Sequence, residues 1–134
     1  MLRIVLGVAG GFIAWLIVWV GSEKAISAVW PAFGSHQQAF EEAIKTGGQF
    51  TPNSTMLFTH IVLGSAVSVL AGYLASLIAG EDKLAPLIVG GLLLLMGIAK
   101  AIMSWQLVPF WYHVSFTLIL LPMAFLGGKL IATN

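Results

Sequence analysis

Three ionisable side chains, His60, Lys100 and His113, lie inside stretches of sequence that are otherwise apolar. Lysine is charged at pH 7 and histidine changes charge near neutral pH, so together they could hold an anion or exchange a proton. Such residues inside a membrane segment are candidate functional residues, because the apolar surroundings make them costly. A structural role stays open for each: Lys100 could extend its ammonium to the lipid headgroups, and the histidines could bond neighbouring helices or lie at the interface.

The spacing of these residues places them at a similar depth in the membrane. His60 lies about six residues inside the start of its apolar segment, roughly 9 Å along a helix. Lys100 and His113 lie about five and four residues from the turn at 105–109. We therefore expect a polar, partly hydrated pocket that opens at one face of the membrane. The residues expected to line or rim this ligand-binding pocket are His60, Lys100, His113, Tyr112, Trp30, Trp105, Trp111 and Glu23.

The elements that would position these residues are four long apolar segments. They cover residues about 4–22, 56–79, 84–104 and 110–131, and each can cross the ~30 Å hydrocarbon core as a helix. The chain is 59% hydrophobic and 8% charged, with a mean hydropathy of +0.99. A water-soluble fold of 134 residues could not bury so many apolar segments. We therefore predict a single transmembrane domain over residues 1–134, an all-α bundle of four transmembrane helices.

The connection over residues 23–55 is the only long one, and it contains a pattern typical of an amphipathic helix. Residues 35–38 (Ser-His-Gln-Gln) match a capping box, and the glycines at 47–48 mark a helix end. Between them, apolar residues beginning with Phe40 recur on one face and polar residues on the other. We expect a short amphipathic helix from about 35 to 46 in this first outer loop, which could serve only to cover the helix ends.

Small residues recur at every fourth position of the second apolar segment. The stripe consists of Gly64, Ser68, Gly72, Ser76 and Gly80. Such stripes let helix backbones approach closely in a membrane, where lipid offers no hydrophobic force between helices. The stripe could pack within the chain or form the seam of a homo-oligomer, and the sequence does not separate the two.

The positions of lysine and arginine indicate how the segments cross the membrane. With the N-terminus inside, three basic residues flank the spans on the cytoplasmic side, namely Arg3, Lys83 and Lys129. Two others, Lys24 and Lys45, then lie outside. The positive-inside rule favours this arrangement, with both the N-terminus and the C-terminus cytoplasmic. The expected pocket and the long connection then face outward.

Several classes of function lack the residues that they need. The chain has no cysteine, so disulfides, thiolate metal sites and cysteine nucleophiles are excluded. No zinc-type histidine pair, phosphate-binding glycine loop or serine elbow is present, so we expect no catalytic residue, metal or cofactor. The net charge of +1 provides no basic field for nucleic acid. The carboxylate nearest to an apolar segment is Glu23, which we expect at the interface.

Four short motifs resemble those of a known group of proteins. They are Gly-Tyr-Leu-Ala-Ser-Leu-Ile-Ala-Gly at 72–80, Val-Pro-Phe-Trp-Tyr at 108–112, Leu-Gly-Gly-Lys-Leu at 126–130, and Trp-Pro at 30–31. With these motifs the chain resembles a group of small four-span bacterial inner-membrane proteins of unknown function. The resemblance implies the four-span topology and a place in the bacterial inner membrane. It assigns no site residues, so the pocket rests on physical argument.

These observations favour a non-enzymatic membrane protein that binds a small anionic or lipid-like ligand, or a partner protein, at the outward-facing pocket. Lys100 would suit a carboxylate or phosphate group. Besides membrane lipids, its partners could be further copies of the chain or another membrane protein. Two other functions stay open: a small oligomeric transporter or channel, and a structural accessory subunit of a membrane complex.

Overall fold

A computed structural model of the chain describes residues 2–46, 54–81, 83–105 and 107–132. Within these ranges the regular secondary structure is entirely α-helical. The helices are α1 (Leu2–Val29), α2 (Pro31–Thr46), α3 (Ser54–Ala79), α4 (Leu84–Met103) and α5 (Phe110–Ala132). All of them except α2 are long and apolar enough to cross a membrane. The predicted all-α fold is thus confirmed, with four helices that by length and composition could span a membrane.

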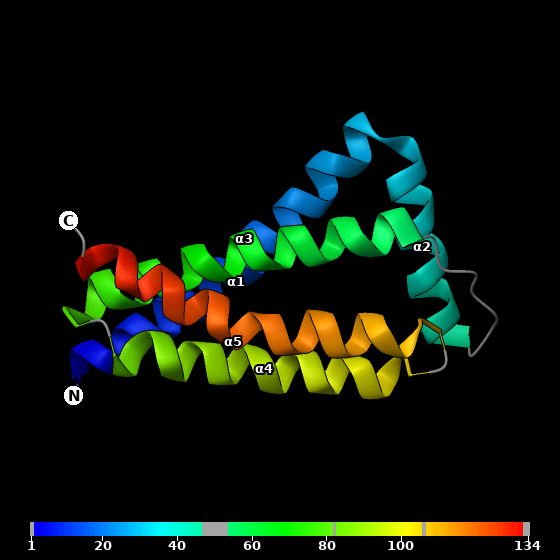
Figure 1. The fold of residues 1–134 in the computed structure, drawn as a ribbon. Helices are drawn as coiled ribbons and strands as arrows, with labels where there is room; N and C mark the ends of the chain where they lie inside the picture. The colour runs from blue at the N-terminus through cyan, green and yellow to red at the C-terminus, as the bar shows by residue number, and fades with distance from the viewer. Residues whose placement is uncertain (1, 47–53, 82, 106, 133–134) are drawn as a thin grey trace.

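The four long helices run side by side, and α2 lies across one end of them (Figure 1). The start of α1, the turn between α3 and α4, and the end of α5 lie together at the opposite end (Figure 1). We call these the α2 end and the terminal end. Both chain termini are therefore on the same side of the bundle, as an even number of crossings requires.

Glycines allow α1 and α5 to pack closely on α3 in the half of the bundle nearer the terminal end. A Cβ atom added to Gly11 of α1 would lie 2.6 Å from the carbonyl oxygen of Ala71 in α3. A Cβ atom on Gly72 would collide with the backbone of Ala124 in α5. The stripe of small residues in α3 therefore serves packing within the chain, which is one of the two alternatives that the sequence leaves open.

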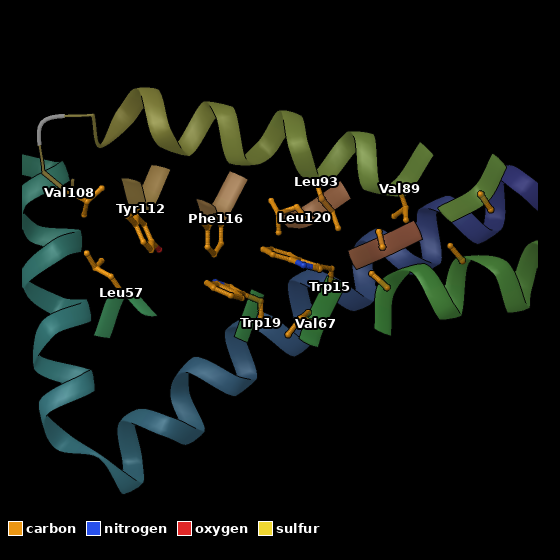
Figure 2. Close-up of a cluster of buried hydrophobic side chains, with 14 of the residues drawn as sticks. Trp15, Trp19, Leu57, Val67, Val89, Leu93, Val108, Tyr112, Phe116 and Leu120 are labelled. Carbon is orange, nitrogen blue, oxygen red and sulfur yellow. The ribbon is translucent and has the colours of Figure 1, made fainter. Parts of the chain in front are cut away.

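Tryptophans replace glycines on the same face of α1 as it approaches the α2 end. The buried residues of α1 recur at every fourth position, namely Gly7, Gly11, Trp15 and Trp19. The two indole rings stack with centroids 5.1 Å apart, and Figure 2 shows them in the middle of the buried cluster, beside Phe116. Because these rings need more room than glycine, α1 diverges from α3 toward the α2 end (Figure 1). The wider space between the helices there holds the polar residues.

The first two helices differ from their predicted bounds. The apolar part of α1 ends near residue 22, but the helix continues to Val29. It can do so because no proline interrupts it before Pro31. α2 begins at Pro31, because proline is well suited to the first position of a helix. The predicted start at the Ser35 capping box is therefore wrong, and Ser35 is an exposed residue inside α2. The amphipathic character of α2 is present, with a buried face that includes Phe40.

The turn at the terminal end is fixed by local capping. Gly80 adopts a positive φ of 74°, which suits glycine at a helix end. The Glu81 carboxylate accepts hydrogen bonds from the backbone N–H groups of Lys83, Leu84 and Ala85 at the start of α4. Burial acts to raise the pKa of Glu81, but these three bonds and the Lys83 charge hold that pKa below its usual value. The turn thereby holds α3 and α4 side by side.

Candidate functional site

Each of the five helices contributes one titratable side chain to the same region at the α2 end. They are Glu23 from α1, His36 from α2, His60 from α3, Lys100 from α4 and Tyr112 from α5. We call these five residues the polar cluster. All of them except Glu23 line one small cavity, and Glu23 contacts His60. Four of the eight residues predicted for the site are therefore brought together.

His60 is the hydrogen-bonding centre of the polar cluster. Its Nδ1 lies 2.9 Å from the carbonyl oxygen of Met56, one turn earlier in α3. Its Nε2 lies 3.3 Å from Oε2 of Glu23 and 3.1 Å from Oε1 of Gln37. The Glu23 side chain is only 15% exposed and that of His60 only 5%. Glu23 is thus a partner of His60 within the cluster.

The partner atoms indicate where the imidazole carries hydrogen. A backbone carbonyl only accepts, so Nδ1 of His60 donates to Met56. The Nε2 atom then faces two oxygens, those of Glu23 and Gln37. The amide nitrogen of Gln37 lies 3.5 Å from Oε1 of Glu41, which leaves its oxygen directed at the imidazole. A second proton, on Nε2, would satisfy both oxygens at once.

The ammonium group of Lys100 lies among aromatic rings in the interior of the bundle. Its Nζ is 4.9 Å from the ring centroid of Phe116, 5.5 Å from that of Trp19 and 5.9 Å from that of Phe40. These rings come from α5, α1 and α2, so the ammonium does not extend to the headgroups. In the part of the chain that the structure describes, no hydrogen bond or ion pair reaches Nζ, and Glu23 is the opposite charge that acts on Lys100.

α2 covers the polar cluster through one face of the helix. The fully buried ring of Phe33 stacks on His60 with centroids 4.8 Å apart, and Gln37 bonds the same imidazole. Phe40 supplies one of the rings around Lys100. Burial, and then the charge of His60, lower the pKa of His36 from its ordinary value of 6.5. The helix thus covers the cluster, and Figure 2 shows α2 next to Leu57 and Val108 at this end of the bundle.

The cavity beneath α2 is small and holds unused hydrogen-bonding capacity. Its volume is about 10 Å³, which is room for about one water molecule. The phenol ring of Tyr112 is buried, and Figure 2 shows it among the side chains at this end of the bundle. No hydrogen bond joins the Tyr112 hydroxyl to another of the described residues. Among the described residues, therefore, neither the hydroxyl nor the Lys100 ammonium has a hydrogen-bond partner at this cavity.

The other four residues predicted for the site lie outside the polar cluster. His113 donates from Nε2 to the carbonyl oxygen of Trp105 at 3.3 Å and stacks on the Trp105 ring. It borders an apolar groove between α4 and α5 on the outside of the bundle. Trp105 and Trp111 are 55% and 44% exposed. Trp30 reaches the cluster only indirectly, because its ring packs on Phe33 with centroids 6.0 Å apart.

Sequence reasoning missed the contribution of α2 to the site. His36, Gln37 and Phe33 were not predicted as site residues, although all three contact or face His60. The available signal was spacing: residues 33, 37 and 40 share one face of a helix only if that helix includes residue 33. Placing the start at 35 removed Phe33 from that face.

The chemistry of the polar cluster suits an anion better than a metal ion. Among the residues that the structure describes, no group of three His, Cys, Asp or Glu side chains could hold a metal. The rings of His36 and His60 lie 6.5 Å apart, and the Lys100 charge beside them opposes a cation. Ammonium, phenol and imidazolium groups are all hydrogen-bond donors. The residues present therefore favour a ligand that accepts hydrogen bonds.

Comparisons with known proteins do not identify a relative of this chain. No protein-family model, curated protein or solved structure matches it. The resemblance to small four-span membrane proteins is therefore supported only by the four helices that could span a membrane. Function has to be argued from the polar cluster itself.

Proposed function

We propose that this protein binds a small anionic group, a carboxylate or a phosphate, within the polar cluster at the α2 end. The observation that carries the proposal is the position of the Lys100 ammonium, which lies among rings with no acceptor from the described residues. A polar or charged group in such surroundings is costly unless it is hydrogen-bonded and paired. An anionic oxygen would provide both a hydrogen-bond acceptor and an opposite charge for the ammonium.

The other members of the polar cluster support an anion at this place. Tyr112 lines the same cavity and can donate its hydroxyl hydrogen. The Glu23 carboxylate is engaged with His60 and does not form an ion pair with Lys100. Aromatic rings stabilise an ammonium but leave its N–H groups without strong acceptors. A bound carboxylate or phosphate oxygen would accept from Lys100 and Tyr112 together.

Entry of such a ligand requires α2 to move. A cavity of about 10 Å³ admits no group larger than about one water molecule. The contacts that hold α2 over the cluster are made by a few side chains, chiefly Phe33, Gln37 and Phe40. α2 would therefore act as a cover that opens for the ligand and closes over it.

The location of the protein forms part of the same proposal. We place it in a bacterial inner membrane with both termini cytoplasmic, which directs the polar cluster outward. The anionic group could then belong to a lipid headgroup of the outer leaflet or to a free anion, and no enzymatic reaction is proposed. A transporter or channel would need a polar path to the terminal end, but Val67, Leu93 and Leu120 fill the core midway along the bundle. Binding alone needs only the one-sided cluster.

Native mass spectrometry of the full chain, extracted gently from its own membrane, tests the proposal. The spectra would compare the unmodified protein with Lys100→Met and with Lys24→Met, a control that removes an exposed lysine near the same end. Acetate and dimethyl phosphate would be added as probes of the two anion classes. We expect an adduct in the unmodified protein and the control, and its loss in Lys100→Met.

The form of the adduct distinguishes the possible sources. A co-purified anionic lipid would identify a headgroup ligand, whereas adducts seen only after acetate or dimethyl phosphate is added would identify a free anion. The absence of any adduct from all three proteins would overturn the proposal. It would favour a structural accessory subunit, whose variants at Lys100 or His60 would differ only in stability.

A further inference from the structure

The charges of the polar cluster cancel before any ligand binds, when each group has its ordinary charge at pH 7 and the histidines are neutral. In these states Lys100 counts as one positive charge, Glu23 as one negative charge, and Tyr112 as neutral. The remaining titratable groups are His36 and His60. With both histidines neutral, an added anion would leave an uncompensated negative charge in an environment of low dielectric, which is strongly unfavourable.

The contact between His60 and Glu23 provides a place for one compensating proton. Because Nδ1 of His60 donates to Met56, a neutral ring would direct the lone pair of Nε2 at the oxygens of Glu23 and Gln37. A proton on Nε2 converts these two opposed contacts into hydrogen bonds at 3.3 and 3.1 Å. The observed geometry is thus that of a site prepared to hold a proton.

From this geometry we infer that anion binding in the polar cluster is coupled to the uptake of one proton by the His60–Glu23 pair. The inference rests on the proposed function. The proton comes from the outer solution and binds at Nε2 of His60, facing Oε2 of Glu23, and no covalent bond breaks elsewhere. The bound site then contains Lys100, protonated His60, ionised Glu23 and the anion, with no net charge.

His36 does not take up a second proton in this scheme. Its ring lies 6.5 Å from that of His60, so the charge placed on His60 opposes a further charge on His36. Burial already lowers the pKa of His36, and a charge on His60 lowers it further. The coupling should therefore be close to one proton for each anion. Such a site would let the pH of the outer solution control the occupancy of an anionic ligand.

Isothermal titration calorimetry on the full chain in lipid nanodiscs tests the coupling, with acetate and dimethyl phosphate as probes. Titrations in two buffers with different ionisation enthalpies give the number of protons taken up directly. We expect about one proton per anion and an affinity that weakens by up to about tenfold per pH unit toward the alkaline side of the range from about pH 5.5 to 8. The reciprocal effect of the anion on proton binding follows from linkage.

Two variants assign the proton to the pair. Glu23→Gln removes the negative charge that offsets Lys100. The anion should therefore still bind, while the number of protons taken up per anion falls below about half of its value in the unmodified chain. His60→Gln keeps a hydrogen-bonding side chain but cannot take the proton, so binding at pH 6 should weaken by at least about tenfold. Thermal unfolding of both variants in the same nanodiscs would check that they fold.

The outcomes separate the two proposals. Binding by the unmodified chain with no proton uptake would overturn the coupling and leave the anion site intact. The absence of binding by either probe at any pH would overturn both. Proton uptake that persists unchanged in His60→Gln would show that another group takes the proton and would also overturn the assignment to this pair.

Discussion

The ring of Phe33 in α2 stacks on the imidazole of His60 in α3, with centroids 4.8 Å apart and ring planes inclined by 20°. Phe33 is fully buried, although it belongs to the helix that lies across the end of the bundle. This contact joins the cover of the polar cluster to its hydrogen-bonding centre. Any movement of α2 must therefore expose both Phe33 and one face of His60.

Phe33→Ala should detach α2 from the bundle without unfolding the four long helices. Removal of a buried phenylalanine ring costs about 3 kcal/mol or more, which corresponds to roughly a 100-fold loss of amide protection. Hydrogen exchange measured by mass spectrometry on peptides from α2 would report this loss. Phe58→Ala, which removes an exposed ring from α3, is the matched control and should leave α2 protected. Equal protection of α2 in both variants would show that Phe33 does not hold it.

The docking of α2 should weaken as the pH falls below about 6.5. Burial and the His60 charge lower the pKa of His36 below its ordinary value of 6.5 while α2 is docked. The undocked helix therefore binds the proton more tightly, so the stabilisation is present above that value and is lost as the pH falls through the lowered pKa. Exchange of α2 amides, corrected for the intrinsic effect of pH, should rise toward pH 5. The rise should be smaller in His36→Gln and unchanged in His113→Gln, which alters a histidine outside the polar cluster.

Gly72 should be intolerant of even one added methyl group. The Cβ atom would collide with the backbone of Ala124, and neither helix can yield without separating α3 from α5. Overpacking of this kind costs about 1–3 kcal/mol. Thermal unfolding in detergent should show a lower midpoint for Gly72→Ala than for Gly91→Ala, because a Cβ on Gly91 meets nothing within 4 Å. Equal midpoints would mean that the two helices are not packed as described.

The hydrogen bond from Trp15 to Ser68 should contribute measurably to the packing of α1 on α3. The indole Nε1 donates to the serine Oγ at 3.1 Å in a buried position. Ser68→Ala leaves that N–H group unpaired and should cost about 1 kcal/mol. Combination with Trp15→Phe in a double-mutant cycle isolates the pairwise energy. Ser65→Ala, whose hydroxyl bonds only its own helix at Ile61, should change stability by a few tenths of a kcal/mol.

Much of the fold could be predicted from the sequence because membrane helices have a strong signal. Each long apolar segment must form a helix to satisfy its backbone hydrogen bonds in lipid. The same signal does not locate helix ends, because hydropathy reports where the membrane stops. α1 passes that point and ends seven residues later, which brings Glu23 onto the helix and within reach of His60.

The sequence predicts the level of the site residues along the bundle, but not the direction in which each side chain points around its helix. Counting residues placed His60 and Lys100 at the correct level of the bundle, together with Tyr112 and His113. Consecutive residues point about 100° apart around a helix, so Tyr112 and His113 point in different directions. Tyr112 faces the polar cluster, whereas His113 turns to Trp105. Without the packing of α5, the sequence cannot show which of the two faces inward.

The orientation of the bundle in the membrane can be tested with single cysteines, since the chain has none of its own. Ser35 is exposed on α2, and Lys83 is exposed in the turn at the terminal end. The positive-inside rule places the terminal end in the cytoplasm. A membrane-impermeant maleimide should therefore label Ser35→Cys on intact cells and label Lys83→Cys only after permeabilisation. The reverse pattern would place the polar cluster inside the cell, and its ligand would then come from the cytoplasm.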